Sequence, residues 1–352
     1  MAQLSSPERV LRSINGQEID RIPCYFRAEQ PLCLKIEQEL HLPDYTAIAR
    51  YFGSDALPVA VRCQDALSIT VLDDHHYLDA FGNRFYHTDN CARVDRPALA
   101  PEGELLPIDS ICWPDGAAIL DVEACVTAAK TVRESGLAVY GGAWASLFTR
   151  CRELLGEETF FIAMMEEPEY VKALVDRVTD FYLDMNKAYL DLCRPYIDVY
   201  YFGIDLGTQR GLFISKEHFQ TFFKENMTRV TKQAKEYGLP VMFHSCGSVA
   251  EIIPDLIDCG IDILDPVQVC AAGMEPASLA KYRGQIGFHG GISTQTTLPF
   301  GTPQEVAEQT QSLIELLGPN RLIVSPDQDM LGEIPLENVK ALFDTVAAYR
   351  VR

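Results

Sequence analysis

The sequence predicts an α/β protein folded as a single (β/α)₈ barrel, because short β-rich runs alternate with amphipathic helical segments along most of the chain. About eight such strand–helix units fit into the 352 residues, a usual size for this barrel. An open, doubly wound sheet is the alternative. We favour the barrel because no predicted strand is followed by a GxGxxG or GxxxxGK[ST] motif, the glycine-rich loops that cradle phosphates in doubly wound proteins.

The N-terminal part supplies the first two strands of the predicted barrel. Ser6 and Pro7 open a first helix, since Pro is favoured in the first helical turn. Strands are expected at residues 22–26 and 57–61, and the helices between them at 32–40 and 45–52. This segment therefore starts the strand–helix alternation on which the barrel prediction rests.

Residues 62–115 interrupt the alternation. Residues 67–72 and 84–87 have the pattern of antiparallel strands, and residues 80–83, Ala-Phe-Gly-Asn, supply a turn to join them. We therefore expect an antiparallel hairpin inserted after the second barrel strand. Segments that follow barrel strands line the catalytic rim, so the insertion should lie there.

The other six strands and their helices follow residue 136. The strands are expected at 137–141, 199–204, 241–245, 261–264, 286–288 and 322–324. The helices are expected at 169–191, 216–237 and 249–259, after Thr302-Pro303, and at 336–349. Ser215 is a favourable N-cap for the second of these helices, and Gly260 is a typical stop for the third.

The composition, the N-terminus and the cysteines together predict a soluble cytoplasmic protein. Thirty basic against fifty acidic residues give a formal charge of −20, which argues against nucleic acid or an anionic membrane as a partner. No apolar run is long enough for a membrane span, and the N-terminus lacks the pattern of a signal peptide. The eleven cysteines are odd in number and form no CxxC pair, so free thiols in a reducing compartment are expected.

Residues 241–247, Val-Met-Phe-His-Ser-Cys-Gly, are the most informative stretch for function. Side chains alternate along a strand, so His244 and Cys246 point to the same side, opposite their apolar neighbours. Imidazole and thiolate are preferred ligands of zinc. A lone histidine would more often be a core residue, but the pair at a strand tip predicts a metal site.

Other strand tips supply further candidates, because the active sites of (β/α)₈ enzymes lie at the C-terminal ends of the strands. The fourth strand ends at Asp205, followed by Gln209, and the first ends near Arg27 and Glu29. We expect these four side chains to line the pocket. Two metal ligands are too few, so a third is expected from the tip of the eighth strand, where residues 327–329 read Asp-Gln-Asp.

Five motifs can be compared with a known family. They are His244-Ser245-Cys246-Gly247, Asp262-x-Leu264-x-Pro266-Val267-Gln268, Phe288-His289-Gly290-Gly291-Ile292, Leu298-Pro299-x-Gly301-Thr302-Pro303 and Ile334-Pro335-x-Glu337-Asn338. On these motifs the chain resembles the uroporphyrinogen decarboxylase superfamily over nearly its whole length. The resemblance implies one barrel domain over residues 1–352, with 62–115 as its insertion.

The superfamily has two main branches. True decarboxylases carry an Arg-Gln-Ala-Gly-Arg motif that grips substrate carboxylates. The matching residues 26–30 read Phe-Arg-Ala-Glu-Gln, so only Arg27 remains of the two arginines. The other branch consists of zinc methyltransferases that work with corrinoid proteins, and its mark is a His-x-Cys pair plus a distant cysteine. The pair His244 and Cys246 makes this chain resemble the methyltransferase branch.

One departure concerns the third metal ligand. Counting back from Pro335, the distant cysteine of the methyltransferases falls at Gln328, and glutamine is a poor zinc ligand. Either Asp327 or Asp329 supplies an oxygen, or the metal is held differently. A site richer in oxygen suits a methoxy oxygen or an amine better than a thiolate acceptor such as coenzyme M or homocysteine.

The resemblance therefore implies a zinc-dependent methyltransferase that moves a methyl group between a small methylated substrate and a partner corrinoid protein. His244 and Cys246 would hold the metal with Gln328 or Asp329 beside them, and Asp205, Gln209, Arg27 and Glu29 would line the pocket. A homodimer is an open possibility. The alternatives are a decarboxylase of a cyclic or aromatic acid, with Arg27 as carboxylate anchor, and an inactive barrel that only binds a small molecule or a corrinoid protein.

Overall fold

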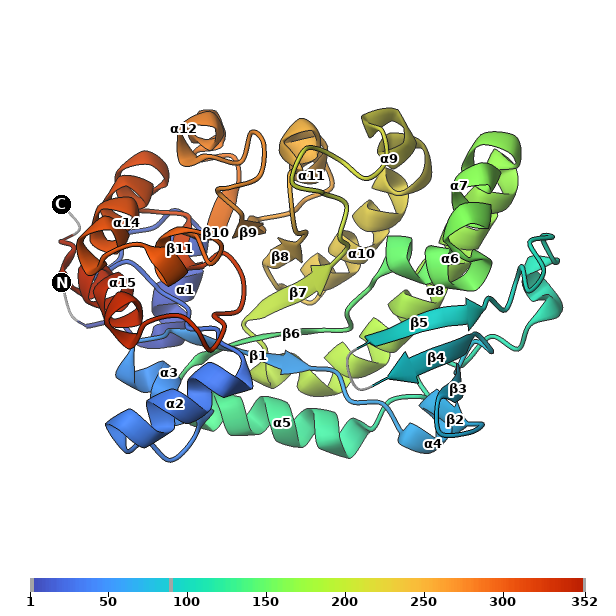
Figure 1. The fold of residues 1–352 in the computed structure, drawn as a ribbon, viewed down its shortest axis with the longest axis horizontal. Helices are drawn as coiled ribbons and strands as arrows, with labels where there is room; N and C mark the ends of the chain where they lie inside the picture. Colours follow the sequence, from blue (N-terminus) through green and yellow to red (C-terminus); the bar gives the residue numbers. More distant parts are fainter. Residues whose placement is uncertain (1–2, 89–90, 351–352) are drawn as a thin grey trace.

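The computed structural model describes residues 3–88 and 91–350. Within them the central feature is a curled sheet of seven parallel strands (Figure 1). In their order across the sheet, these are β1 (Ala56–Ala60), β6 (Ala138–Gly142), β7 (Val199–Gly203), β8 (Val241–His244), β9 (Ile263–Val267), β10 (Gly287–Ile292) and β11 (Leu322–Pro326). The sheet is consistent with a TIM-like barrel. The strands expected from residue 57 onward in this sheet are confirmed, with shifted ends.

The strand expected at residues 22–26 is not formed as a regular strand. Cys24 makes an isolated parallel bridge with Val324 in β11, and the N–H of Tyr25 donates to the carbonyl of Val324 at 2.9 Å. On the other side, the N–H of Asp55 donates to the carbonyl of Cys24 at 2.8 Å. The segment therefore bonds both to β11 and to the residue that precedes β1, although too few bonds repeat to make a strand.

Helices surround the sheet (Figure 1). They are α1 (Ser6–Ile14), α2 (Gln30–Leu40), α3 (Tyr45–Tyr51), α4 (Asp65–Ser68), α5 (Val122–Glu134), α6 (Leu147–Leu155), α7 (Glu157–Glu166), α8 (Pro168–Cys193), α9 (Lys216–Phe222), α10 (Lys224–Glu236), α11 (Ile253–Asp258), α12 (Pro276–Leu279), α13 (Thr297–Phe300), α14 (Pro303–Leu317) and α15 (Leu336–Ala348). Capping boxes open α1 and α14. None of the helices in the described ranges is long and apolar enough to cross a membrane.

Two expected helices differ from the structure. The helix predicted at 216–237 is divided at Phe223, which lies between α9 and α10 with φ −121° and is completely buried. The helix predicted at 249–259 is a 3₁₀ turn, Ala250–Ile252, followed by α11. Pro254 lies in the first turn of α11. Because Pro has no N–H to donate, continuous α-helical bonding cannot run through it.

Residues 69–96 contain a four-stranded antiparallel sheet rather than the expected two-stranded hairpin. Its strands are β2 (Ile69–Val71), β3 (His76–Asp79), β4 (Arg84–Thr88) and β5 (Cys91–Arg96), in that order. The predicted pairing of 67–72 with 84–87 is wrong, because β3 lies between them and the turn at 80–83 joins β3 to β4. Asp79 shapes that turn, since its Oδ1 accepts the N–H groups of Phe81 and Asn83 at 3.0 and 2.9 Å.

The strands separate two apolar regions. Met242 belongs to a small cluster with Tyr140 and other strand residues. Val241 and Phe243 belong to the large cluster that packs the sheet against the helices. Because side chains alternate along β8, His244 lies on the same side as Met242. The alternation thus directs the imidazole to the side of the small cluster, opposite the helices that the large cluster packs against the sheet, at the C-terminal end of the strand.

Candidate metal centre

The candidate centre lies at the C-terminal ends of β7 and β8. His244 is the last residue of β8, and Cys246 follows two residues later. Asp205 follows two residues after Gly203, the last residue of β7. Gly203 pairs in parallel with His244, so the two strand ends bring the three side chains together. The N–H of Cys246 donates to Oδ1 of Asp205 at 3.0 Å, which fixes the carboxylate beside the strand tip.

The three side chains have the spacing of zinc ligands. One ligand atom from each of Asp205, His244 and Cys246 lies within 4.8 Å of the other two. Nε2 of His244 is 3.5 Å from Sγ of Cys246 and 3.6 Å from Oδ1 of Asp205. Zinc bonds of about 2.3 Å to sulfur and about 2.0–2.2 Å to nitrogen or oxygen, at tetrahedral angles, separate ligand atoms by about 3.4–3.6 Å. The residues therefore fit a zinc ion, and the Asp205 side chain is 61% exposed on its open side.

Asp265, in β9, holds the opposite nitrogen of the same imidazole. Its Oδ2 accepts from Nδ1 of His244 at 2.7 Å and from the hydroxyl of Tyr201 at 2.6 Å. Its Oδ1 accepts from Nδ1 of His289 at 2.5 Å. Burial raises the pKa of this completely buried carboxyl, but His289, His244 and Arg27 together hold that pKa well below its ordinary value. Asp265 is thus a buried carboxylate that fixes the orientation of the His244 imidazole, the role that such partners have for metal-binding histidines.

These contacts also determine the protonation of His244. Burial lowers its pKa, whereas the hydrogen bonds with Asp265 and Cys246 raise it, and the net result is a pKa of about 10. A metal ion binds neutral imidazole, so its binding would displace the proton from Nε2. Because Asp265 holds Nδ1, Nε2 is the nitrogen that faces the centre.

Replacing Asp265 with asparagine is expected to weaken zinc binding by about 10- to 100-fold, because the carboxylate that orients His244 is lost while the size of the side chain is kept. Competition with a chromophoric chelator measures the change in affinity. Asp258→Asn is the matched control, since Asp258 lies on the surface and pairs with Lys224. Equal zinc affinity in the two variants would contradict the orienting role of Asp265.

The two aspartates after β11 lie outside the group of potential ligands found in the described residues. Asp327 is buried, and its Oδ1 accepts from the N–H and the hydroxyl of Thr294, both at 2.8 Å. Burial raises the pKa of Asp327. Asp329 forms an ion pair with Arg27, with 3.4 Å between Oδ1 and Nε. The carboxylate oxygen that joins His244 and Cys246 in this group therefore comes from Asp205, after β7. It does not come from the residues after β11, the strand from which the third ligand was predicted.

Gln328 does reach the centre, but with its amide NH₂ group. Its Nε2 lies 3.3 Å from Sγ of Cys246, whereas its Oε1 accepts from Nη2 of Arg27 at 2.7 Å. An amide NH₂ donates hydrogen bonds and has no lone pair available for a metal ion. In this orientation Gln328 contacts the thiol without offering a ligand atom.

The other predicted pocket residues divide into two groups. Arg27 is buried beside the centre and contacts Asp265, Gln328 and Asp329. Gln209 and Glu29, in contrast, have exposed side chains. Glu29 lies at the N-cap of α2, where its side chain makes no capping hydrogen bond. The structure therefore brings Arg27 and Asp205 to the centre, and it does not bring Gln209 or Glu29 into the contacts around the thiol and imidazole.

Four residues at the centre were missed from the sequence. Asp265 and Tyr201 lie inside strands whose other residues are apolar, and that pattern is typical of core. Gln268 is buried and its Nε2 lies 3.8 Å from Sγ of Cys246. The ring of Trp144, just beyond β6, is 5.3 Å from that of His244. The signal available in the sequence was their position near the C-terminal ends of strands. Using that signal requires the strand ends to be predicted to within one or two residues.

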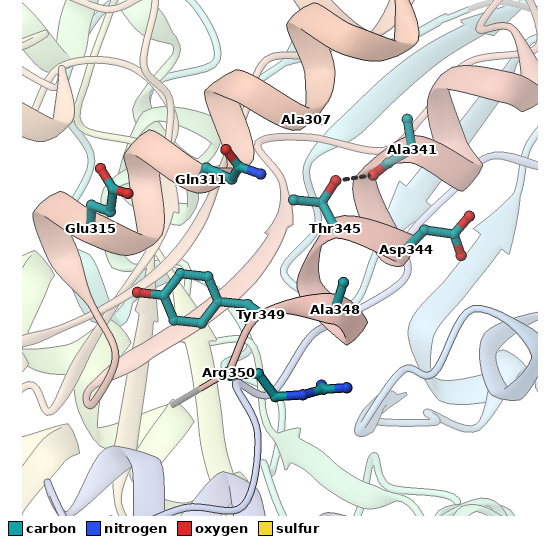
Figure 2. Close-up of a pocket in the computed structure, with 9 residues that line it drawn as sticks. All are labelled: Ala307, Gln311, Glu315, Ala341, Asp344, Thr345, Ala348, Tyr349 and Arg350. Carbon is teal, nitrogen blue, oxygen red and sulfur yellow. Dashed lines mark hydrogen bonds between the residues drawn. The ribbon is translucent and has the colours of Figure 1, made fainter. Parts of the chain in front are cut away.

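A cavity of about 280 Å³ lies beside the centre. It is lined by Val61, Cys63, Ser68, Asp79, Ala80, Phe81, Ile119, Trp144, Arg150, Phe181, Tyr182 and Met185. Trp144 belongs both to this lining and to the contacts of His244. A larger groove of about 740 Å³ lies between α14 and α15 (Figure 2), and none of its lining residues belongs to the centre. The smaller cavity is therefore connected to the candidate centre through Trp144, which lines the cavity and packs against His244.

Comparisons with known proteins agree with this architecture. The profile of the uroporphyrinogen decarboxylase (URO-D) family matches residues 5–349. The methylated-thiol–coenzyme M methyltransferase of Methanosarcina mazei is 27% identical over 198 residues, which are 55% of this chain and 49% of that relative. The chain thus matches about half the length of this curated relative. The solved structure of a methyltransferase from Methanosarcina mazei has a TM-score of 0.70 at 17% identity, covering 98% of this chain and 99% of that one, a likeness that shows the fold.

Proposed function

Because the chain belongs to the uroporphyrinogen decarboxylase family, we propose that it is a zinc-dependent methyltransferase that moves a methyl group between a small methylated substrate and a corrinoid protein. The convergence of Asp205, His244 and Cys246 at two neighbouring strand ends carries the proposal. The partial match to a methyltransferase that acts on methylated thiols and coenzyme M supports the same reaction class.

In this proposal Asp205, His244 and Cys246 hold the zinc ion. When bound there, zinc supplies Lewis acidity to the heteroatom that carries the methyl group. Asp265 holds the His244 ring in place through Nδ1. Asp205 lies on the exposed side of the centre, and this exposure leaves room for the substrate and for a partner to approach.

We propose a methoxy compound or a methylamine as methyl donor. The reason is the donor set, in which one thiolate, one imidazole and one carboxylate converge. An oxygen ligand makes the centre harder than a pair of thiolates would, and a harder centre favours oxygen and nitrogen over sulfur. The apolar part of the donor would lie in the cavity beside Trp144, whose lining is mostly apolar and whose volume suits a small molecule.

Decarboxylation is the less supported alternative. A decarboxylase of this family would use Arg27 as its carboxylate anchor. In the structure Arg27 is already paired with Asp265 at 3.6 Å and with Asp329 at 3.4 Å, and it donates to Gln328. A guanidinium compensated in this way is a poor anchor for a multiply charged acid.

We also propose that residues 1–352 form one barrel domain in which 62–115 is an insertion on the catalytic rim. The bonds of Cys24 and Tyr25 to β11, and of Cys24 to Asp55, support closure of the sheet by this segment as its eighth member. The turn between β3 and β4 supplies Ala80 and Phe81 to the cavity beside the centre. That contribution supports a position of the insertion at the substrate-binding end.

The assay for the proposed function mixes the zinc-loaded protein with a reduced corrinoid protein and one candidate donor at a time, and follows the cobalt absorption spectrum. Methylation of the corrinoid is expected with a methoxy or methylamine donor and not with methylated coenzyme M. Incubation with uroporphyrinogen should give no coproporphyrinogen. Corrinoid that stays unmethylated with every donor, or formation of coproporphyrinogen, would contradict the proposal.

A further inference from the structure

Two glutamine side chains approach the sulfur of Cys246. Nε2 of Gln328 lies 3.3 Å from Sγ, and Nε2 of Gln268 lies 3.8 Å from the same atom. Gln328 follows β11 and Gln268 follows β9, so the two amides come from different strand ends. Both distances are within the range of a hydrogen bond to sulfur, which is a larger and softer acceptor than oxygen.

The orientation of the Gln328 amide is fixed by two donors. Its Oε1 accepts from Nη2 of Arg27 at 2.7 Å and from the N–H of Asp329 at 3.0 Å. Turning the amide by 180° would set its NH₂ group against these two donors and lose both hydrogen bonds. Arg27 is itself held by Asp265 and Asp329. The NH₂ group of Gln328 must therefore face Sγ of Cys246.

The orientation of Gln268 is fixed in the same way. Its Oε1 accepts from the N–H of Gly247 at 2.6 Å. Its Nε2 also lies 3.5 Å from the carbonyl oxygen of Asp327, an acceptor that only an NH₂ group can satisfy. Gln268 is buried, so water does not compete for these contacts. Both amides thus present N–H groups, and not oxygen, to the sulfur.

We propose that Gln328 and Gln268 are positioning residues that donate N–H bonds to the Cys246 thiolate while it binds zinc, so that Gln328 tunes the metal through the sulfur and does not bind the metal itself. This inference rests on the proposed function. Hydrogen bonds to a thiolate withdraw part of the charge that it gives to a metal ion, and partners of this kind tune ligand strength. When the thiolate donates less electron density to it, the metal ion is a stronger Lewis acid toward an oxygen or nitrogen of the substrate.

The test uses cobalt(II) in place of zinc in the full-length protein, because the sulfur-to-cobalt charge-transfer absorption reports the electron density on the thiolate. In Gln328→Leu the donor is replaced by an apolar group of similar size. Without the hydrogen bond, the thiolate holds more electron density and transfers an electron to cobalt at lower energy. The charge-transfer band is therefore expected to shift to longer wavelength. Gln328→Ala should give a shift in the same direction, and it serves as a second variant if leucine disturbs folding.

Gln311→Leu is the matched control, since Gln311 lies in the groove between α14 and α15 (Figure 2) and does not contact the centre. Its band should coincide with that of the unmodified protein. If both Gln328 variants bind cobalt and their band is unshifted, this inference is wrong but the metal centre stands. If the unmodified protein binds no cobalt, both the inference and the proposed metal centre are wrong. A shifted band without methyl transfer would support the inference while counting against the proposed reaction.

Discussion

Asp55→Ala is expected to lower the free energy of unfolding by about 3–5 kcal/mol, the usual cost of removing one partner from a buried ion pair. Asp55 is completely buried just before β1. Its Oδ1 accepts from Arg9 at 2.6 Å, and its Oδ2 accepts from Arg21 at 2.7 Å and from the N–H of Cys24 at 3.1 Å. Arg9 is only 3% exposed. Without Asp55, the buried Arg9 keeps only Asp20 as a carboxylate partner, and Arg21, which is 30% exposed, loses its ion pair.

Urea unfolding followed by circular dichroism measures this change. Asp180→Ala is the control, because Asp180 pairs with Arg229 on the surface, where an ion pair contributes about 0–1 kcal/mol. Asp55→Asn should fall between the two, since the amide keeps one acceptor oxygen but not the charge. If Asp55→Ala lowers the free energy of unfolding by less than about 1 kcal/mol, the ion pairs of Asp55 with Arg9 and Arg21 do not stabilise the junction of α1 with the sheet.

Cys246→Ala is expected to reduce the zinc content from about one ion per chain to almost none while the folded structure persists. Catalytic metal sites depend on each of their few protein ligands. Cys246 is partly exposed at a strand end and is not part of either apolar cluster, so the fold does not depend on its side chain. Methyl transfer to the corrinoid protein should be lost together with the metal.

Elemental analysis of protein purified without chelators gives the zinc content, and thermal unfolding of the metal-free proteins checks the fold. Cys270→Ala is the matched control, because Cys270 is also a free cysteine near a strand end but lies outside the metal-binding group among the described residues. Stoichiometric zinc retained in Cys246→Ala, or equal loss of zinc in both variants, would refute the assignment of Cys246 as a ligand.

The fold was largely predictable because strand alternation and helix caps are local signals. The strand at 241–245 and the capped helix that begins at Thr302-Pro303 both formed where the pattern indicated. Tertiary packing produced the failures. Phe223 is drawn into the core and divides a helix, and β3 pairs between two segments that had been predicted to pair with each other. Neither event leaves a local trace in the sequence.

The site was predictable only in part. Spacing alone put His244 and Cys246 on one side of a strand. Asp265 could not be recognised, because a carboxylate between Leu264 and Pro266 in a buried strand has no local signal, and only the neighbouring strands supply the two imidazoles that it accepts from. The direction of the Gln328 amide depends on Arg27, 301 residues away along the chain.

The position of Trp144 gives the molecule an internal optical reporter. The chain has two tryptophans, and Trp144 alone lies between the ring of His244 and the cavity beside it. Indole emission depends on the polarity of its surroundings and is quenched by nearby protonated imidazole. In a Trp113→Phe background, excitation at the red edge of the indole band would give emission from Trp144 alone, because tyrosine does not absorb there. Metal loading and filling of the cavity could then be followed as two separate fluorescence changes without any added label.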